Sequence, residues 1–237
     1  MRRDFERRSV EAELMEGEDV RPEDLHACLK DLETVNTLTL TRRPTLAWLD
    51  RAIGDDAGGR TVSLLDVGSG RGDFLRRAQG WAQRRGVRIE AVGVDLNPLS
   101  AVAAREATPP GMDIAYHTAD IFAFNPGRRF DFVVSSLFAH HLPDEAVVRF
   151  LRWMEHTAIR GWFVNDLHRH AVPFHGFRLM ARIAGWHRFV RHDGPVSIAR
   201  GFRRADWLRF LEAAGLDRSD VEIGWHMPFR LCVGRLK

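Results

Sequence analysis

The sequence predicts an α/β domain built around a mostly parallel β-sheet. Between residues 61 and 167, short apolar segments alternate with amphipathic segments of helical periodicity, which is typical of strand–helix–strand units. In addition, the stretch LLDVGSGRGDFL, residues 64–75, has three glycines directly after an apolar segment that ends in an acid. A glycine-rich seam between a strand and a helix is a common ligand-binding position in such folds.

The elements follow one another in a regular order. Two helices are expected before the first strand, because apolar residues recur at helical spacing after Pro22 and again over residues 43–53. A last helix is expected at 204–214, ended by Gly215, and the tail 220–237 predicts two β segments interrupted near Pro228 that form an antiparallel edge pair. The expected strands are residues 61–68, 88–96, 113–120, 130–138 and 160–167, and the helices between them are residues 73–86, 97–107 and 144–158.

The chain is expected to divide into an N-terminal helical arm or lid, residues 1–55, and a ligand-binding domain, residues 56–237. The first twenty residues are highly charged, so we expect them to be frayed or loosely helical. Within the domain, residues 168–203 are rich in histidine, arginine and aromatic residues, and they are expected to form an insertion over the substrate. Its apolar residues either line a pocket or pack between helices; they are Phe174, Phe177, Met180, Trp186 and Phe202.

Composition argues against several classes of protein, namely nucleic-acid-binding, disulfide- or zinc-stabilised, and membrane-spanning proteins. The formal net charge is only +3 and the arginines are scattered between acids, so no nucleic-acid partner is expected. Cys28 and Cys232 lie far apart without metal-like spacing, which argues against a disulfide framework or a zinc site. No apolar stretch is long enough for a signal peptide or a membrane span, so we expect a cytoplasmic protein, either a monomer or a homodimer.

The spacing at the glycine seam separates two ligand classes. Dinucleotide-binding folds use G-x-G-x-x-G, whereas this chain has G-x-G-x-G over Gly68, Gly70 and Gly72, with Asp66 in front. A carboxylate at that position would repel a pyrophosphate and attract a cationic ligand. A mere tight turn is the alternative interpretation.

This pattern of an acid followed by x-G-x-G-x-G resembles the first motif of the class I S-adenosylmethionine (SAM)-dependent methyltransferases. The likeness extends over about residues 60–165. The ends of the second, third and fourth expected strands resemble the family's later motifs, in the same order along the chain. It implies a Rossmann-like fold with a mostly parallel seven-stranded sheet, helices on both faces and an antiparallel C-terminal edge. It also implies SAM as cofactor, with S-adenosylhomocysteine as product.

The resemblance further implies which residues hold the cofactor. Asp95 would bind the ribose hydroxyls, although it could instead cap the helix that begins near Pro98. Asp120 and Ile121 would flank the adenine, unless they are a loop acid and an ordinary core residue. Arg43, or alternatively Arg42, would hold the methionine carboxylate. The full predicted set is Asp66, Gly68, Ser69, Gly70, Gly72, Asp95, Leu96, Asp120, Ile121, Ser135 and Arg43.

Three histidines are candidates for a general base that deprotonates an acceptor hydroxyl. His141 and His140 follow the fourth strand, and His168 follows the fifth, so all three belong to the sheet edge where ligands bind. Adjacent residues rarely point the same way, so at most one of the pair is expected to face the substrate. Any of them could instead be a positioning or structural residue. Arg200 would either meet an acidic group or be a plain surface residue.

A metal is not predicted. Asn165 and Asp166 after the fifth strand resemble part of the magnesium site of catechol methyltransferases. That site also needs an acid just after the fourth strand, and this chain has SSLFAHH there.

The function expected from the resemblance is O-methylation of a small aromatic or lipid-like molecule, most simply a phenol, a quinol or a polyketide-derived compound. The arrangement is similar to the ubiquinone- and menaquinone-type enzymes and to methyltransferases of polyketide-derived phenols. Carbon methylation of an activated ring, methylation of RNA or protein, and a non-catalytic SAM-binding regulator are the alternatives. Residues 125–128, NPGR, lack the N-P-P-[YF] pattern of amino-group methylators.

Overall fold

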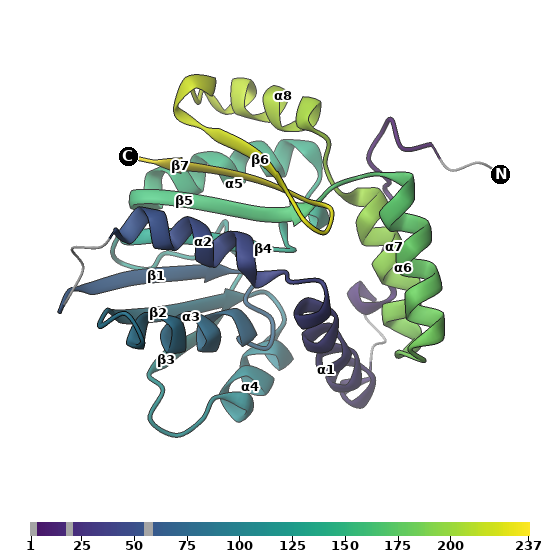
Figure 1. The fold of residues 1–237 in the computed structure, drawn as a ribbon, viewed down its shortest axis with the longest axis horizontal. Coiled ribbons are helices and arrows are strands. Elements are labelled where there is room, and N and C mark those ends of the chain that lie inside the picture. The colour runs from purple at the N-terminus through teal and green to yellow at the C-terminus, as the bar shows by residue number, and fades with distance from the viewer. Residues whose placement is uncertain (1–3, 18–20, 55–58) are drawn as a thin grey trace.

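The computed structural model describes residues 4–17, 21–54 and 59–237. A seven-stranded sheet forms its centre, in the order β3-β2-β1-β4-β5-β7-β6 (Figure 1). β1 to β5 run parallel, and β7 and β6 add an antiparallel edge. The strands are β1 (Thr61–Val67), β2 (Arg88–Asp95), β3 (Ile114–Thr118), β4 (Phe130–Ser136), β5 (Ala158–Leu167), β6 (Glu222–His226) and β7 (Arg230–Leu236). The predicted mostly parallel sheet with an antiparallel C-terminal edge is confirmed.

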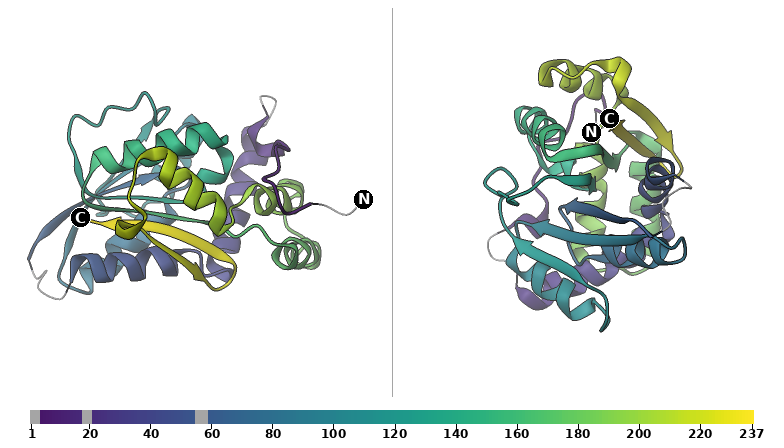
Figure 2. Two further views of the ribbon diagram at one scale, coloured as in Figure 1. Left: turned by 90° about the horizontal axis from the view of Figure 1, so that it is seen from above. Right: turned by 90° about the vertical axis from the view of Figure 1, so that its left-hand side faces the viewer.

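Helices cover both faces of this sheet, as the left view of Figure 2 shows. One face packs against α5 and α8 through Phe150, Trp207 and other apolar residues, and the other packs against α2, α3 and α4. The five helices are α2 (Arg42–Ile53), α3 (Asp73–Gln83), α4 (Pro98–Ala107), α5 (Asp144–Thr157) and α8 (Arg204–Ala214). α2, expected in the N-terminal arm, buries Trp48 and Leu49 in this core and therefore belongs to the helical layer of the domain.

A second group of helices packs together at the carboxyl ends of the parallel strands, on the right in Figure 1. It consists of α1 (Pro22–Leu38), α6 (Ala171–Ile183), α7 (Arg188–Arg200) and the short 3-10 helix η1 (Leu14–Glu16). Two further 3-10 helices are η2 (Ala139–His141) after β4 and η3 (Arg218–Asp220) before β6. α6 and α7 form a hairpin that corresponds to the predicted insertion.

The N-terminal segment was expected to be frayed or loosely helical; among its described residues Leu14–Glu16 form a 3-10 helix, and the segment is not frayed. The amide of Ser9 donates to the carbonyl of Ala199 at 2.9 Å. Arg8 donates to the carbonyl oxygens of Arg200, His140 and Leu142 and pairs with Asp144. The charged residues that suggested disorder are the ones that hold residues 4–17 against the domain.

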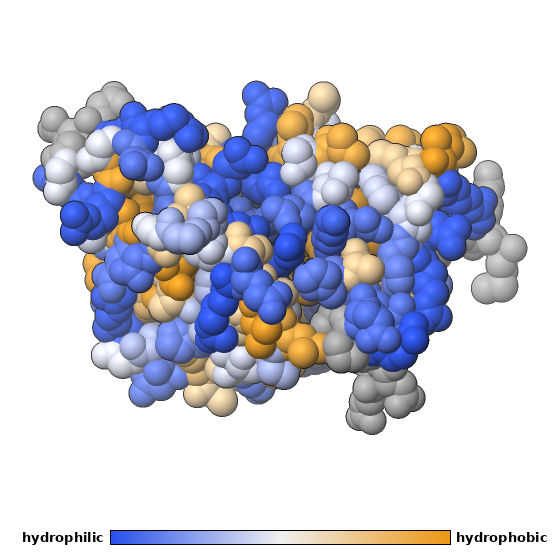
Figure 3. All heavy atoms as spheres, turned by 90° about the horizontal axis from the view of Figure 1, so that it is seen from below, coloured by the Kyte–Doolittle hydropathy of each residue, from blue (hydrophilic) through white to orange (hydrophobic). Residues whose placement is uncertain are grey.

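Hydrophilic and hydrophobic residues are interspersed on the molecular face in Figure 3. Both cysteines are buried free thiols. Within the described part of the chain, no helix combines the length and the apolarity that crossing a membrane requires.

Candidate functional site

A cavity of about 1190 Å³ lies where the carboxyl ends of β1 and β4 meet, beneath α1, α7 and the N-terminal segment. The strand order reverses between β1 and β4, so the connections that follow these two strands lead in opposite directions. Such a reversal leaves a crevice at the carboxyl ends of the two strands. Typical ligand pockets measure about 300–1,000 Å³, so this cavity has room for more than one small molecule.

The glycine loop forms one wall of the cavity. Gly68, Gly70 and Gly72 all have positive φ, at 71°, 50° and 73°. Gly70 has open space where a side chain would begin, and its N–H donates to Oδ2 of Asp95 at 2.8 Å. Gly72 does not line the cavity; it precedes α3 at a point where any side chain would collide with Tyr116. The backbone is therefore exposed to a ligand at Gly70, while Gly72 allows close packing.

Two acids flank this loop. Asp66 is 2% exposed and lines the cavity, and its Oδ1 has no hydrogen-bond partner among the described residues. Burial, followed by the negative charges of Asp73 and Asp95, raises the pKa of Asp66 well above its usual range. A cationic ligand group would supply the missing partner and favour the ionised carboxyl group.

Asp95 also lines the cavity, and its Oδ1 accepts the amide of Asn97 at 3.0 Å. Each carboxylate oxygen of Asp95 retains a lone pair for a ligand hydroxyl. Of the other predicted cofactor residues, Ser69, Leu96, Asp120 and Ile121 line the cavity as well.

Besides Gly72, two other predicted cofactor residues, Ser135 and Arg43, lie outside the cavity, and a chain neighbour of each lines it. The hydroxyl of Ser135 donates to the carbonyl of Val67 at 3.1 Å, whereas Ser136 lines the cavity and its buried hydroxyl has no hydrogen-bond partner in the described part of the chain. Arg43 is exposed at a separate shallow depression. Arg42 lines the main cavity and pairs with Asp73 at 2.8 Å.

His140 and His141 lie in η2, directly after β4, and both line the cavity. His140 is 3% exposed; its Nδ1 lies 2.7 Å from Oδ1 of Asp166, and its amide donates to Oδ2 at 3.1 Å. Burial alone would raise the pKa of Asp166, but His140, the Leu167 amide and His141 together outweigh it, and the pKa lies below its usual value. Because a carboxylate only accepts, Nδ1 carries the hydrogen and Nε2 of neutral His140 has the lone pair.

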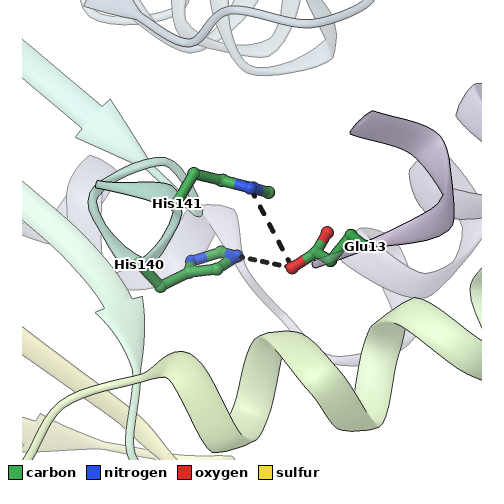
Figure 4. Close-up of side chains that lie close together, drawn as sticks. All are labelled: Glu13, His140 and His141. Atoms are coloured by element: carbon green, nitrogen blue, oxygen red, sulfur yellow. Dashed lines mark ion pairs between the residues drawn. The ribbon is translucent and has the colours of Figure 1, made fainter. Parts of the chain in front are cut away.

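The expectation that only one histidine of the pair would face the cavity is wrong. Figure 4 shows both rings directed toward Glu13, and the ring centroids are 4.2 Å apart. In a 3-10 turn, consecutive side chains are about 120° apart rather than opposite as in a strand, so both can reach one side.

Glu13 was not identified from the sequence. It is 4% exposed, and its Oε1 lies 3.8 Å from Nε2 of His140 and 3.9 Å from Nδ1 of His141. The hydroxyl of Ser197 on α7 donates to the same oxygen at 2.7 Å. No local pattern distinguishes Glu13 from the other acids near it, because its partners lie far away in the sequence.

His168 lies outside the cavity, half-buried, with its amide bonded to the carbonyl of Phe229. Burial, and then the charges of His170 and Arg203, lower its pKa. Arg200 is not a plain surface residue: it is 9% exposed and donates to the carbonyl oxygens of His140 and His141 at 3.2 and 2.9 Å. Arg200 therefore stabilises the position of η2.

The residues of the predicted insertion serve both expected purposes. Phe177 and Met180 line the cavity, whereas Phe174, Trp186 and Phe202 pack in apolar clusters. The polar residues that raised the idea of a magnesium site are engaged within the protein. Asn165 donates to Thr41 and Thr45, and Asp166 holds His140.

The fold is similar to those of several solved methyltransferases. Magnesium protoporphyrin IX methyltransferase from Synechocystis PCC 6803, with bound SAH, has a TM-score of 0.55 at 17% identity, over 84% of this chain and 82% of that one. The plantazolicin methyltransferase BpumL with SAH has a TM-score of 0.57 at 12% identity, over 90% and 95%. Human N-acetylserotonin methyltransferase with SAM has a TM-score of 0.62 at 16% identity, over 92% of this chain and 56% of that one. At such identities the likeness concerns the fold.

The fold is that of the class I SAM-dependent methyltransferases. Residues 64–158 match the family model described as a methyltransferase domain, and this stretch contains the glycine loop and the histidine pair. Residues 64–158 of the chain are therefore similar to a methyltransferase domain. No curated protein matches it in sequence.

Proposed function

We propose that this protein is a SAM-dependent methyltransferase that methylates an oxygen of a small aromatic molecule, such as a phenol, a quinol or a polyketide-derived compound. The observation that carries the proposal is the continuity of the cavity. One cavity is lined both by Gly70 and Asp95 and by His140 and His141; we call these the first and the second end of the cavity.

The residues at the first end fit SAM. The unpartnered, buried Asp66 carboxyl group suits the ammonium group of its methionine part, and the open space at Gly70 admits the ligand close to the backbone. Asp95 would accept the ribose hydroxyls, and Ile121 would pack against the adenine. Arg42 lines this cavity and is the better candidate for the methionine carboxylate than Arg43. When bound, SAM supplies a methyl group made electrophilic by its sulfonium.

The residues at the second end suit an apolar acceptor with a hydroxyl group. Apolar and aromatic surface lines the same cavity as the histidine pair, provided by Met15, Leu32, Phe138, Phe177 and Met180. Nε2 of His140 can accept the hydroxyl proton while Asp166 holds the ring from behind. An oxygen–carbon bond forms, the sulfur–carbon bond breaks, and the proton resides on His140 until it is released to solvent. A phenol with a pKa near ~10 needs such help at neutral pH.

The position of the cavity supports a small acceptor over RNA or a protein surface, since residues of the N-terminal segment, α1 and α7 line it. Two of the structural neighbours are methyltransferases of magnesium protoporphyrin IX and N-acetylserotonin, which are small molecules.

The test is methyl transfer from SAM carrying an isotopically labelled methyl group to a panel of phenols, quinols and resorcinol-type polyketides, read by mass spectrometry. We expect labelled methyl ethers and stoichiometric S-adenosylhomocysteine. Label found on ring carbon would instead support carbon methylation. If calorimetry detects no SAM binding, the proposal is overturned at its first step.

A further inference from the structure

Glu13, His140 and His141 are the one group of metal-ligating side chains that converges among the described residues. One ligand atom of each residue lies within 4.8 Å of the others, and both rings face the same carboxylate oxygen in Figure 4. We propose that these three residues form a two-histidine, one-carboxylate binding site for a divalent transition metal such as zinc or ferrous iron.

The three ligand atoms lie within 4.8 Å of one another and must move closer together to hold an ion. Ligand atoms at about 2.0–2.2 Å from a tetrahedral or octahedral metal are roughly 3.0–3.5 Å apart. The measured separations from Oε1 of Glu13 are 3.8 Å to His140 and 3.9 Å to His141. Small rotations of the three side chains would close this difference.

The surroundings match those of a built metal site. A histidine ligand usually donates its other ring N–H to a carboxylate, which fixes the ring and increases its basicity. Asp166 provides this contact to His140 at 2.7 Å, and it is fully buried. Ser197 supports Glu13 in the same way, through a hydrogen bond of 2.7 Å from α7.

The local charge indicates which metals fit. Glu13 and Asp166 are acids that pair with the histidine rings, and Nη1 of Arg200 lies 3.8 Å from Glu13, which offsets part of their charge. Affinity must therefore come mainly from the two imidazoles. Imidazole ligands suit zinc, iron, copper and nickel, whereas magnesium prefers oxygen ligands.

Such an ion would face the acceptor end of the cavity, which all three side chains line. Three protein ligands leave coordination positions open, and these positions favour an acceptor with two neighbouring oxygens, such as a catechol or a hydroxyketone. This role rests on the proposed function. An ion and a proton compete for the same lone pair of His140, so in the loaded enzyme the acceptor proton leaves to solvent.

The test measures metal binding directly. Protein dialysed against EDTA is titrated with Zn²⁺ by calorimetry and with Co²⁺ by visible absorption. We expect one equivalent of each metal and a cobalt spectrum with nitrogen ligation. Glu13→Gln and His141→Ala should each weaken binding at least tenfold, and Glu11→Gln, an exposed acid on the same segment, should not. Asp166→Asn should weaken it about 10–100-fold.

Circular dichroism checks that each variant is folded, and Glu13→Asp, which keeps the carboxylate, should retain part of the affinity. Absence of binding by folded wild-type protein, or binding unchanged in both ligand variants, overturns the proposal. Methyl transfer is measured on the same samples. EDTA-treated protein that binds no metal yet turns over fully refutes the metal site and leaves the proposed function intact. Metal binding without any methyl transfer would support the metal site and refute the proposed function.

Discussion

Oδ1 of Asp166 lies 2.7 Å from Nδ1 of His140, and both side chains are almost completely shielded from solvent. The carboxylate thus determines which ring nitrogen carries the hydrogen and directs the other nitrogen toward the cavity. Asp166→Asn keeps the size but can donate to Nδ1, which moves the hydrogen to Nε2. We expect the turnover number to fall about 10²–10⁴-fold. The affinity for SAM, measured by calorimetry, should not change; a parallel loss of SAM binding would contradict a role at the acceptor end.

Asp66 links ligand binding to stability. Its pKa in the folded protein is raised by burial, whereas in the unfolded chain it is near ~3.9. The folded state therefore binds the proton more tightly. The stabilising contribution of protonated Asp66 is complete below the pKa that Asp66 has in the unfolded chain. It is lost as the pH rises through the pKa that Asp66 has in the folded protein. We expect Asp66→Asn to increase the thermal stability of the ligand-free protein at neutral pH.

The same substitution should weaken SAM binding at least tenfold, because a hydrogen bond to a charged group contributes about 1.5–3 kcal/mol. Melting curves from pH 4 to 8, with and without SAM, measure both effects. In wild type, SAM affinity should increase with pH over this range, since the ammonium group requires the ionised carboxylate. A stabilised variant with unchanged SAM affinity would remove Asp66 from the binding site.

Asp95→Ala should reduce the affinity for SAM by a few kcal/mol, because two charge-assisted hydrogen bonds to the ribose and the contact with the Gly70 amide are lost. Asp113→Ala, at an exposed acid outside the cavity, is the matched control. Calorimetry with SAM and with S-adenosylhomocysteine measures both variants. Equal affinities for the two variants would refute ribose recognition by Asp95.

Arg8→Ala should detach the N-terminal segment. The side chain of Arg8 bonds three carbonyl oxygens and pairs with Asp144, so its removal should lower the free energy of unfolding by about 2–4 kcal/mol. Urea denaturation measures this loss, and limited proteolysis should show faster cleavage before residue 17. Arg7→Ala, at the exposed neighbouring position, should change neither result. SAM binding should persist in both variants.

Much of the fold could be predicted from the sequence because its signals are local. The strand–helix alternation, the helix that ends before Gly215 and the paired β segments around Pro228 depend on periodicity and turn residues that lie close together. The glycine loop could be predicted for the same reason, because the spacing of its three glycines is contained within a few residues.

The candidate site could be predicted only in part, because side-chain direction at a strand end changes with every residue. Ser135 and Ser136 show this, since the second and not the first lines the cavity. Glu13 could not be predicted, because its partners are more than a hundred residues away and nothing in its own segment indicates burial.

The two ends of the cavity have separate origins in the chain. In the proposed function, the loops after β1 and β2 would hold the methyl donor, while Glu13, Met15 and the α6–α7 hairpin line the rest of the same cavity. Exchanging the N-terminal segment and the α6–α7 hairpin between homologues should therefore change the preferred acceptor and leave the methyl donor the same. Such exchanges are a route by which one scaffold can diversify during evolution.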